Sequence, residues 1–580
     1  MPRTGSNRCD TTAMTSSNIS AAARVHQRDR ARAAASYLAI FLAVVSLFGP
    51  LLHPLTSLIS GWLQGPVTLF PEFLTQISRI YAVFGAFGLF IVARYLRTGN
   101  AVAWAGSLVL LLANAVLHLG KFSDWPVMVL SVAGGLWLAA KHRAFPVWPG
   151  KFLTRRVLLI SAGALGVATL IAGGFFVRQM KAGHQSIGGE VQILFGAFGG
   201  ELQERGAHPR WELAAALIIC LTAMMLWFLY DSNRTRPAGT REQLAQRERA
   251  RAVVLAHGGG TLDYFALRDD KQYFFLADSV IAYAVRGSVC LVSPDPIGPA
   301  AQQEEIWAEF MLLAERRGLT VSVLGAAANW LDIYERSGLR AVYLGDEAIV
   351  ETQGFSLDGK RFKSLRQGHA RLGRAGYTVV HRNPLEIDAK LRERLTELAT
   401  ESRQGEVERG FSMTLSRLFD PADKELLLSI ALDAEGVAQA FIQWVPAPAV
   451  NGWSLDVMRR STAEQVPGGL TDFVILETIF KLRAEGAGGL GLNFAVLREA
   501  IAGAPDASLF EKLVARQASK HAQVASLWKF NAKYDPRWQP RYAAVGTVDL
   551  WLTQGLAMAQ AEGYAEVPGL SSRSRTPEQN

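Results

Sequence analysis

Runs of apolar residues fill most of the first 230 of the 580 residues, and they constrain the fold of this chain more than any other feature. The runs cover residues 36–54, 77–93, 102–120, 125–140, 157–177 and 211–230. Each is near the ~20 residues that a helix needs to cross a bilayer, although the fourth is short and its ends would have to snorkel. Few ionisable residues fall within the runs, so nothing marks an ion or proton path. The sequence therefore predicts an α-helical transmembrane region at 36–232 with about six spans, which we interpret as an anchor.

Lysine and arginine residues at the ends of the runs predict the orientation of the spans, because positive residues collect on the cytoplasmic side. They precede the first run, separate the second from the third and the fourth from the fifth, and follow the sixth. Residues 1–35 are then a basic cytoplasmic tail, and the region after the last span is cytoplasmic too. The loop at 178–210 fits least well, because its basic residues would face outward. If the fifth run were not a span, the C-terminal region would lie outside.

Beyond about residue 241 the composition becomes that of a soluble α/β protein. Strands come before and between helices, and the second half of this region repeats the order of the first. The expected strands cover 252–256, 272–276, 280–285, 289–293, 320–324, 341–344, 426–432, 438–445, 452–458 and 489–493, and the expected helices lie near 302–317, 386–402 and 470–484. The simplest account is two copies of one supersecondary plan, at 250–380 and 381–555, followed by a disordered tail at 556–580.

The strand expected at 452–458 leads through a polar loop into the helix expected at 470–484. Gly468 and Gly469 close that loop, so they lie at the N-terminus of the helix. Free backbone N–H groups and the positive end of the helix dipole meet there, and glycine lets a ligand approach the main chain closely. This arrangement predicts a site for an anion, and we expect it to hold the donor substrate.

Asp456 and Arg459 place a carboxylate and a guanidinium in the same strand. Because side chains of a regular strand alternate between its two faces, residues three apart point to opposite sides. Both can serve one site only if the strand ends or bulges near Met458. A structural ion pair at the end of a strand is the alternative interpretation.

The stretch 359–377 is rich in lysine and arginine and contains no acid. If it forms a helix, four of its cations share one stripe, and its apolar side chains occupy the opposite face. The stripe contains Lys360, Lys363, Arg371 and Arg374, and the apolar face contains Phe362, Leu365 and Leu372. We predict that the stripe, together with Arg366, binds phosphates of tRNA. A solvated surface is the alternative, although such a surface usually interleaves acids.

The stretch 527–542 interleaves aromatic residues with cations that include Lys533, Arg537 and Arg541. Rings beside cations suit an unpaired nucleotide end or a lipid headgroup surface, through stacking and charge. Pro536 and Pro540 forbid a long helix, so we expect an irregular lid that contributes phosphate contacts. The alternative is a capping segment whose aromatic rings fill the core.

The remaining composition points to a phosphate-rich partner and to no metal or cofactor. A net charge of +9 suits anionic lipid or nucleic acid. The three cysteines have no paired or metal-like spacing. A G-x-G-x-x-G match at 486–491 follows a helix and enters a strand, which is the reverse of a dinucleotide site. The glycines at 258–260 resemble an oxyanion loop, but the chain has no G-x-S-x-G elbow, and a helix-opening turn is the better interpretation.

Several motifs in the region 250–550 carry a resemblance to a known family. They are HGGGTLDYFALRDDKQYFF, SPDPIGP, GDEAIVE with FSLDGKRFKSLRQ, ERGFSM, the D-x-x-R of SLDVMRR, and FNAKYDPRWQPRY. In this order they resemble the C-terminal domain of the multiple peptide resistance factor family, the aminoacyl-phosphatidylglycerol synthases. The variants GLNFAVLR and FNAKYDP are most similar to the membrane-region half of bacterial proteins that fuse lysylphosphatidylglycerol synthesis to a lysyl-tRNA synthetase. The resemblance implies two tandem acetyltransferase-like (GNAT) units.

The resemblance also implies an activity and a location. The family transfers an aminoacyl group, here expected to be lysyl, from aminoacyl-tRNA to phosphatidylglycerol, which alters membrane surface charge and resistance to cationic peptides. The protein would be a multi-pass protein of the bacterial inner membrane with a cytoplasmic catalytic region. No synthetase module follows residue 550, so a separate synthetase is expected to supply the donor. Six spans are also fewer than the family's full membrane region has, which puts lipid flipping in doubt.

Asp456 and Arg459 match the functional Asp and Arg of that family, and Lys533 falls in its basic C-terminal motif. The donor is an activated ester, so the enzyme has to align the lipid hydroxyl, assist loss of its proton and stabilise an oxyanion. Asp456 is expected either to assist the proton or to hold the donor's α-ammonium group. Arg459 would steady the developing charge or a phosphate.

Two other functions and the identity of the amino acid stay open at this stage. An acyl-CoA-dependent N-acyltransferase could use the same fold, with the glycine loop holding pyrophosphate. A membrane-tethered module could bind RNA or lipid without catalysis. A cationic side chain of the transferred amino acid could be bound by any of several acids, for which the candidates are Asp278, Glu347 and Glu408.

Overall fold

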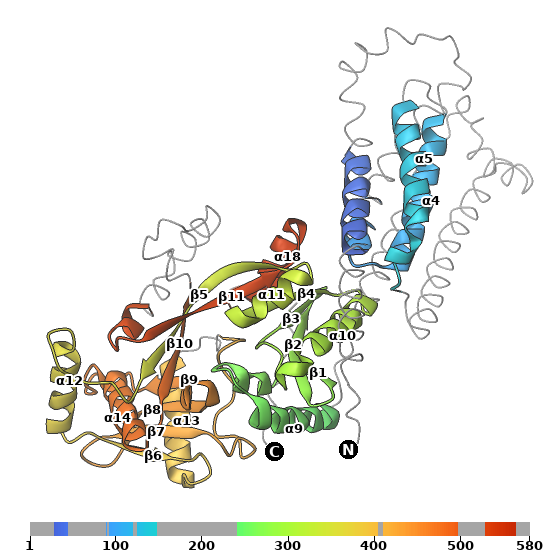
Figure 1. Ribbon diagram of the computed structural model, residues 1–580. Coiled ribbons are helices and arrows are strands. Elements are labelled where there is room, and N and C mark those ends of the chain that lie inside the picture. The colour runs from blue at the N-terminus through green and yellow to red at the C-terminus, as the bar shows by residue number, and fades with distance from the viewer. Residues whose placement is uncertain are drawn as a thin grey trace, which may run out of the picture. The chain divides into compact units, whose positions relative to one another are not determined.

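The computed structural model describes residues 28–44, 89, 92–119, 125–147, 240–403, 410–496 and 528–563 (Figure 1). The chain divides into two compact units: one holds residues 24–236 with 313–319, and the other holds the rest. The predicted spans at 157–177 and 211–230, and most of the span at 77–93, lie outside the described residues.

The longer described helices of the first unit cover residues 28–44, α4 (Ala101–Leu119) and α5 (Trp125–Ala140), and residues 92–97 are helical too. They share an apolar core that includes Leu42, Leu111 and Leu138. The last two coincide with the third and fourth predicted spans. Within the described parts of the chain, none of the helices is both long and apolar enough to cross a membrane.

The second unit is built on one eleven-stranded sheet, in the order β1-β2-β3-β4-β11-β5-β10-β9-β8-β7-β6. The strands are β1 (Gln272–Leu276), β2 (Ser279–Arg286), β3 (Val289–Val292), β4 (Thr320–Ala327), β5 (Arg340–Glu351), β6 (Thr378–Arg382), β7 (Leu427–Leu432), β8 (Ala438–Ala447), β9 (Gly452–Arg460), β10 (Gly489–Val496) and β11 (Arg537–Val545). Neighbours are antiparallel except for the pairs β3/β4 and β9/β10. The sheet runs without interruption through both predicted repeats, because β5 pairs with β10.

Helices lie on both faces of this sheet. They are α9 (Thr240–His257), α10 (Gln303–Arg316), α11 (Leu331–Arg336), α12 (Lys363–Arg374), α13 (Ala389–Arg403), α14 (Leu470–Ala484) and α18 (Trp551–Ala561). On one face α14 packs on Trp444, Leu455 and Leu490, and we call this the α14 face. On the other, α13 packs on Ile430 and Phe441, and we call this the α13 face.

The second half of the segment predicted to be an irregular lid is instead a strand within the sheet, and its residues 528–532 are helical. β11 comes from the end of the described chain and lies between β4 and β5, two strands of the predicted first repeat (Figure 1). Pro536 and Pro540 were the reason to exclude a long helix, but a strand accepts a proline where no ladder needs its N–H. Pairing with β4 begins only at Arg541, so the missing N–H lies outside that ladder.

Two other boundaries differ from the prediction. The expected strand at 252–256 is the last part of α9. A short continuous apolar run shows neither the alternation of a strand nor the spacing of a helix, so the sequence alone could not distinguish the two here. At the other end, α18 continues to Ala561 and takes in the first residues of the tail predicted at 556–580. The buried Glu562 then accepts the N–H groups of Phe411 and Ser412, which fixes the end of this helix.

Candidate active site

A bulge in β9 brings Asp456 and Arg459 to the same face of the sheet. On β8, Gln443 pairs with Val457 while its neighbour Trp444 pairs with Leu455, so Asp456 is the extra residue of β9. The bulge reverses the alternation of side chains at this point. Arg459 lies opposite Phe441, whose side chain belongs to the α13 face, and Asp456 contacts Gln443 on that same face. The bulge that the sequence analysis required for Asp456 and Arg459 to share one face of the sheet is therefore present.

The Asp456 carboxylate is buried and held by donors from two segments. Its Oδ1 accepts the Leu415 N–H at 2.9 Å, and its Oδ2 accepts Nε2 of Gln443 at 2.7 Å. Only 5% of the residue is exposed. Arg459 donates from Nη1 to its neighbouring Met458 carbonyl at 2.9 Å. These two hydrogen bonds, from separate segments of the chain, fix the orientation of the Asp456 carboxylate.

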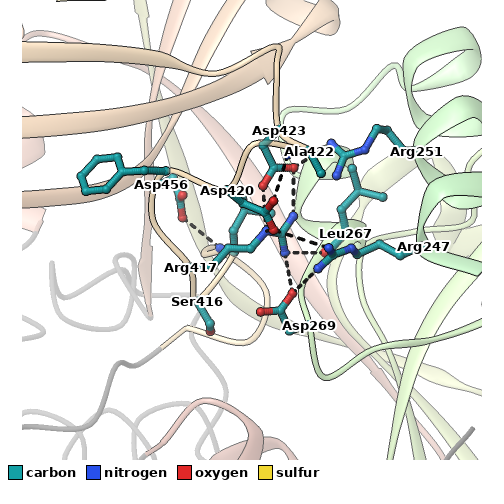
Figure 2. A network of polar contacts seen from close by, with 12 residues as sticks. Arg247, Arg251, Leu267, Asp269, Ser416, Arg417, Asp420, Ala422, Asp423 and Asp456 are labelled. Atoms are coloured by element: carbon teal, nitrogen blue, oxygen red, sulfur yellow. Dashed lines mark hydrogen bonds and ion pairs between the residues drawn. The ribbon is translucent and has the colours of Figure 1, made fainter. Parts of the chain in front are cut away.

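A network of ion pairs holds the segment that contacts Asp456 (Figure 2). Arg417, two residues after Leu415, donates to Asp423 at 2.7 and 2.9 Å and to Asp269 at 2.9 Å. Asp423 is fully buried and also accepts Nη1 of Arg251 at 2.6 Å. Burial by itself would raise the pKa of Asp423, but the hydrogen bonds and charges of the two arginines outweigh it and lower that pKa. Through Asp423, the network connects the loop that contains Leu415 and Arg417 to Arg251 of α9.

A second buried polar group lies on the α13 face around Arg541. Its guanidinium donates to Oε2 of Glu347 at 2.6 and 3.0 Å and to the Thr261 hydroxyl at 2.8 Å. Asp263 accepts the N–H groups of Gly259 and Gly260, so the glycine-rich segment is a turn capped by its own acid. Burial raises the pKa of Asp263.

Asp295 belongs to the same part of the sheet. It accepts the Tyr334 hydroxyl at 2.6 Å and the Ala327 N–H at 2.8 Å. Burial raises its pKa to about 6. The charges of Arg541 and Asp263 both act on this carboxyl, so three buried acids share the field of one guanidinium.

Lys271 is a buried amine close to these segments. Its Nζ donates to the Ser293 carbonyl at 2.5 Å and lies 4.5 Å from the ring centroid of Phe411. Burial lowers its pKa to about 7. Since the unfolded chain keeps this amine protonated up to about pH 10.4, it binds more protons than the folded chain between pH 7 and 10.

Lys271→Met should therefore change how stability depends on pH. The penalty from the buried amine is full below pH 7 and fades as the pH rises toward 10. We expect the stability of wild type to rise, relative to Lys271→Met, by at most about 1.4 kcal/mol per pH unit over this range. Urea unfolding of both proteins at pH 7, 8 and 9 measures the difference. Parallel pH profiles would show that Lys271 titrates at its ordinary value.

The predicted donor-binding glycines lie with Lys533 at the N-terminus of α14. Gly469 precedes the helix with a φ of +89°, which glycine adopts readily. Asp472, in the first turn, accepts Nζ of Lys533 at 3.0 Å and the Tyr534 hydroxyl at 2.5 Å. The Gly468 carbonyl accepts Nη2 of Arg371 at 2.7 Å. These groups belong to the side of the sheet that α14 covers, whereas Asp456 and Arg459 lie on the α13 face.

The basic stretch forms α12, which presents cations to solvent. Leu365 and Leu372 are buried against α14, and the imidazole of His369 contacts the Glu477 carboxylate at 2.6 Å. The side chains at the predicted phosphate-binding positions Lys360, Lys363, Arg366, Arg371 and Arg374 are all exposed. The helix begins at Lys363, so Lys360 precedes it. Among the described residues, neither lysine has an ion pair.

The other predicted residues differ in their surroundings. Arg537 is exposed and contacts Glu351 at 3.3 Å, whereas Arg541 is buried in its pair with Glu347 and offers no surface to a phosphate. Asp278 is exposed, and Glu408 lies outside the described residues. Gln443 and Leu415 were not predicted. ERGFSM marked the segment before Leu415 as a motif, but the contacts to Asp456 depend on the register of β8 and on a distant loop.

Comparison with known proteins gives relatives for most of the chain. Residues 251–545 match a family described as "Phosphatidylglycerol lysyltransferase, C-terminal". The "Lysylphosphatidylglycerol biosynthesis bifunctional protein LysX" of Mycobacterium ulcerans is 36% identical over 351 residues, which cover 59% of this chain and 31% of the relative. The protein of that name from Mycolicibacterium gilvum is 33% identical over 518 residues, covering 83% and 45%. The chain thus spans less than half the length of these relatives.

A solved structure shares the fold of the second unit. The structure of L-PGS from Bacillus licheniformis matches with a TM-score of 0.50 and 24% identity, over 55% of this chain and 97% of that one. At this identity the likeness shows the fold alone, which confirms the predicted α/β architecture of the C-terminal region. The match to the family profile covers half of this chain. The resemblance drawn from the motifs is confirmed, and the chain belongs to the multiple peptide resistance factor family of phosphatidylglycerol lysyltransferases.

Proposed function

We propose that this protein transfers an aminoacyl group, most simply lysyl, from aminoacyl-tRNA to a glycerol hydroxyl of phosphatidylglycerol. The observation that carries the proposal is the buried Asp456 carboxylate, fixed by Leu415 and Gln443 at a bulge that also brings Arg459 to its face. A buried carboxylate that two donors hold in one orientation is a candidate general base. The relatives are named for lysylphosphatidylglycerol biosynthesis, which supports the same reaction class.

In the proposed reaction the lipid hydroxyl oxygen attacks the ester carbonyl of the donor. Its proton passes to the Asp456 carboxylate, and the carbonyl oxygen becomes an oxyanion that Arg459 stabilises by charge. Collapse of the tetrahedral intermediate breaks the bond to the tRNA ribose oxygen, which leaves with the proton from Asp456. The donor is already activated, so alignment and electrostatic stabilisation are sufficient and no covalent nucleophile is needed.

The transfer is tested with the purified full-length chain in phosphatidylglycerol vesicles. Labelled lysyl-tRNA and labelled acetyl-CoA are offered in separate reactions, and the label in extracted lipid is measured. We expect labelled lipid from lysyl-tRNA alone. Label from acetyl-CoA would assign the protein to the acyl-CoA-dependent transferases instead, and tRNA binding without any labelled lipid would make it a binding module.

We propose that the α12 cations and the cluster around Lys533 bind phosphates of tRNA, while its aminoacylated end reaches Asp456 on the α13 face. The support is the row of exposed cations on α12 and the bond between Arg371 and the Gly468 carbonyl, which links this row to the N-terminus of α14. Lys533 lies 4.8 Å from the ring centroid of Phe530, so an aromatic ring and a cation meet at one end of the row. Proteins that bind single-stranded nucleic acid combine aromatic rings with cations in this way.

Neutralising Lys360, Lys363, Arg371 and Arg374 with glutamine should weaken tRNA binding and its dependence on salt. Each phosphate contact contributes about 0.7–0.9 to the slope of log K against log salt, so the slope should fall by roughly three units. Binding of aminoacyl-tRNA in detergent and of RNA-free anionic vesicles is measured over a range of salt. The control removes four other exposed cations, Arg340, Arg382, Lys390 and Lys424. A fall with vesicles alone would assign α12 to the membrane surface, and an unchanged slope in both assays would leave it a solvated surface.

We further propose that the N-terminal region is a multi-pass anchor in the bacterial inner membrane, with about six spans and a cytoplasmic catalytic domain. The apolar runs of the sequence support this. So do large apolar side chains on the described helices, since Phe41, Leu112 and Leu136 are 53%, 67% and 69% exposed. Such side chains are expected where lipid replaces water. The second unit then lies on the side where aminoacyl-tRNA is found.

A further inference from the structure

Two buried oxygen atoms on the α13 face have no hydrogen-bond partner within the described part of the chain. They are Oε1 of Glu347, on β5, and Oγ of Ser454, on β9. Both residues are fully buried. The other carboxylate oxygen of Glu347 is occupied by Arg541. Buried acceptors are normally satisfied, because an unpaired buried polar group costs about 1–3 kcal/mol.

Gly491 on β10 lies between these two oxygens. It pairs with Ser454 on one side and with Ile349 on the other. Ala348 belongs to the core of the α14 face, so its neighbours Glu347 and Ile349 point to the α13 face. A Cβ atom built on Gly491 would lie 3.0 Å from Oγ of Ser454 and 3.4 Å from Oε1 of Glu347. The two oxygens therefore converge on the space in front of Gly491, and the absence of a side chain there lets another group approach them.

The group that fits this position is a donor with positive charge. Glu347 shares Arg541 with Asp263 and Asp295, so acids outnumber this guanidinium here. Glu347 and Ser454 both direct an acceptor oxygen without a partner toward the space in front of Gly491. A primary ammonium carries three donors and no acceptor, which matches this set.

The position also has a fixed relation to the proposed catalytic residue. Ser454 and Asp456 are two residues apart on β9, and both contribute to the α13 face. Two residues of strand span about 6–7 Å, which is close to the length of the four-carbon stem of lysine. An amino acid whose terminal ammonium lies at Ser454 can thus place its ester carbonyl beside Asp456.

We infer that Glu347 and Ser454, in front of Gly491, bind the side-chain ammonium of the aminoacyl group. The site makes the donor an amino acid with a terminal primary ammonium, such as lysine or ornithine. This inference rests on the proposed aminoacyl transfer and names the part of the site that selects the amino acid. Alanine, whose side chain has neither stem nor charge, leaves both oxygens unsatisfied.

The test uses the full-length protein in detergent and two small probes. L-lysine methyl ester carries the ammonium, and L-norleucine methyl ester has the same stem without it. Wild type should bind the lysine ester at least about ten-fold more tightly, because a hydrogen bond to a charged group is worth about 1.5–3 kcal/mol. Ser454→Ala and Gly491→Ala should remove most of this preference. Gly491 lacks a positive φ, so alanine there fills the position without straining the backbone.

The matched control is Gly354→Ala, which adds the same methyl where nothing lies within 4 Å and should leave the preference unchanged. Glu347→Gln is not the primary variant, because it also removes the charge that pairs with Arg541. Equal binding of both esters by wild type, or an unchanged preference in Gly491→Ala, would overturn the inference and leave the two oxygens to a buried water.

The lipid product is scored separately. If the lipid product forms but Gly491→Ala keeps the preference for the lysine ester, only this inference is rejected. If wild type prefers the lysine ester but forms no lipid product from any aminoacyl-tRNA, the proposed transfer is rejected, and with it the donor role of the site.

Discussion

Asp456→Asn is expected to lower the rate of lipid aminoacylation by about 10²–10³ while the protein stays folded. Asparagine keeps the size of the side chain, and its carbonyl oxygen can still accept the Leu415 N–H. It cannot take the proton of the lipid hydroxyl, because an amide is not a base at neutral pH. The loss should therefore appear in kcat, with a smaller change in KM for aminoacyl-tRNA.

The measurement compares initial rates of labelled lipid formation at equal amounts of folded protein. Asp278→Asn is the matched control, since this acid is exposed at the turn after β1 and should leave the rate unchanged. Arg459→Ala should also lower the rate, because it removes the charge proposed to stabilise the oxyanion. Equal rates for wild type and Asp456→Asn would remove Asp456 from the chemistry and leave it as a support for the loop at Leu415.

Arg541→Met should destabilise the second unit by about 3–5 kcal/mol, because it leaves the Glu347 carboxylate buried without its partner. The acids Asp263 and Asp295 aggravate the effect, since their charges also act on Arg541. Urea unfolding followed by fluorescence gives the free energy directly. Combining Arg541→Met with Glu347→Gln should recover much of the loss, because the uncompensated charge is then gone.

Arg537→Met is the control on the same strand. Arg537 is exposed and has only a surface ion pair with Glu351, so its removal should change stability by at most about 1 kcal/mol. If Arg541→Met were no less stable than Arg537→Met, the pair with Glu347 would contribute nothing to folding.

The elements that could be predicted from the sequence are those with a clear local pattern. The helix expected at 470–484 has those bounds in the structure, and the strand at 452–458 extends only to Arg460. The exposed and buried sides of α12 also follow from its helical period. In each case the apolar residues repeat at the spacing of one element, so local sequence was sufficient.

The arrangement of the site depends on contacts that local sequence does not contain. Asp456 and Arg459 share a face because β8 pairs with β9 in a register that leaves one residue of β9 unmatched. Arg541 looked like a surface cation because cations and aromatic residues alternate around it. It is buried because β11 lies between β4 and β5. The donor-binding glycines and Asp456 are close in sequence, but β9 and α14 place them on different faces of the sheet.

The proposed reaction makes an aminoacylated phospholipid through Asp456. It is tested most directly by thin-layer chromatography of lipid extracts from cells that lack the gene, carry wild type, or carry Asp456→Asn with equal protein in the membrane. We predict a ninhydrin-positive phospholipid with wild type that is absent without the gene and nearly absent with Asp456→Asn. The absence of such a lipid from cells with wild-type protein, or its presence in equal amount with Asp456→Asn, would contradict the account.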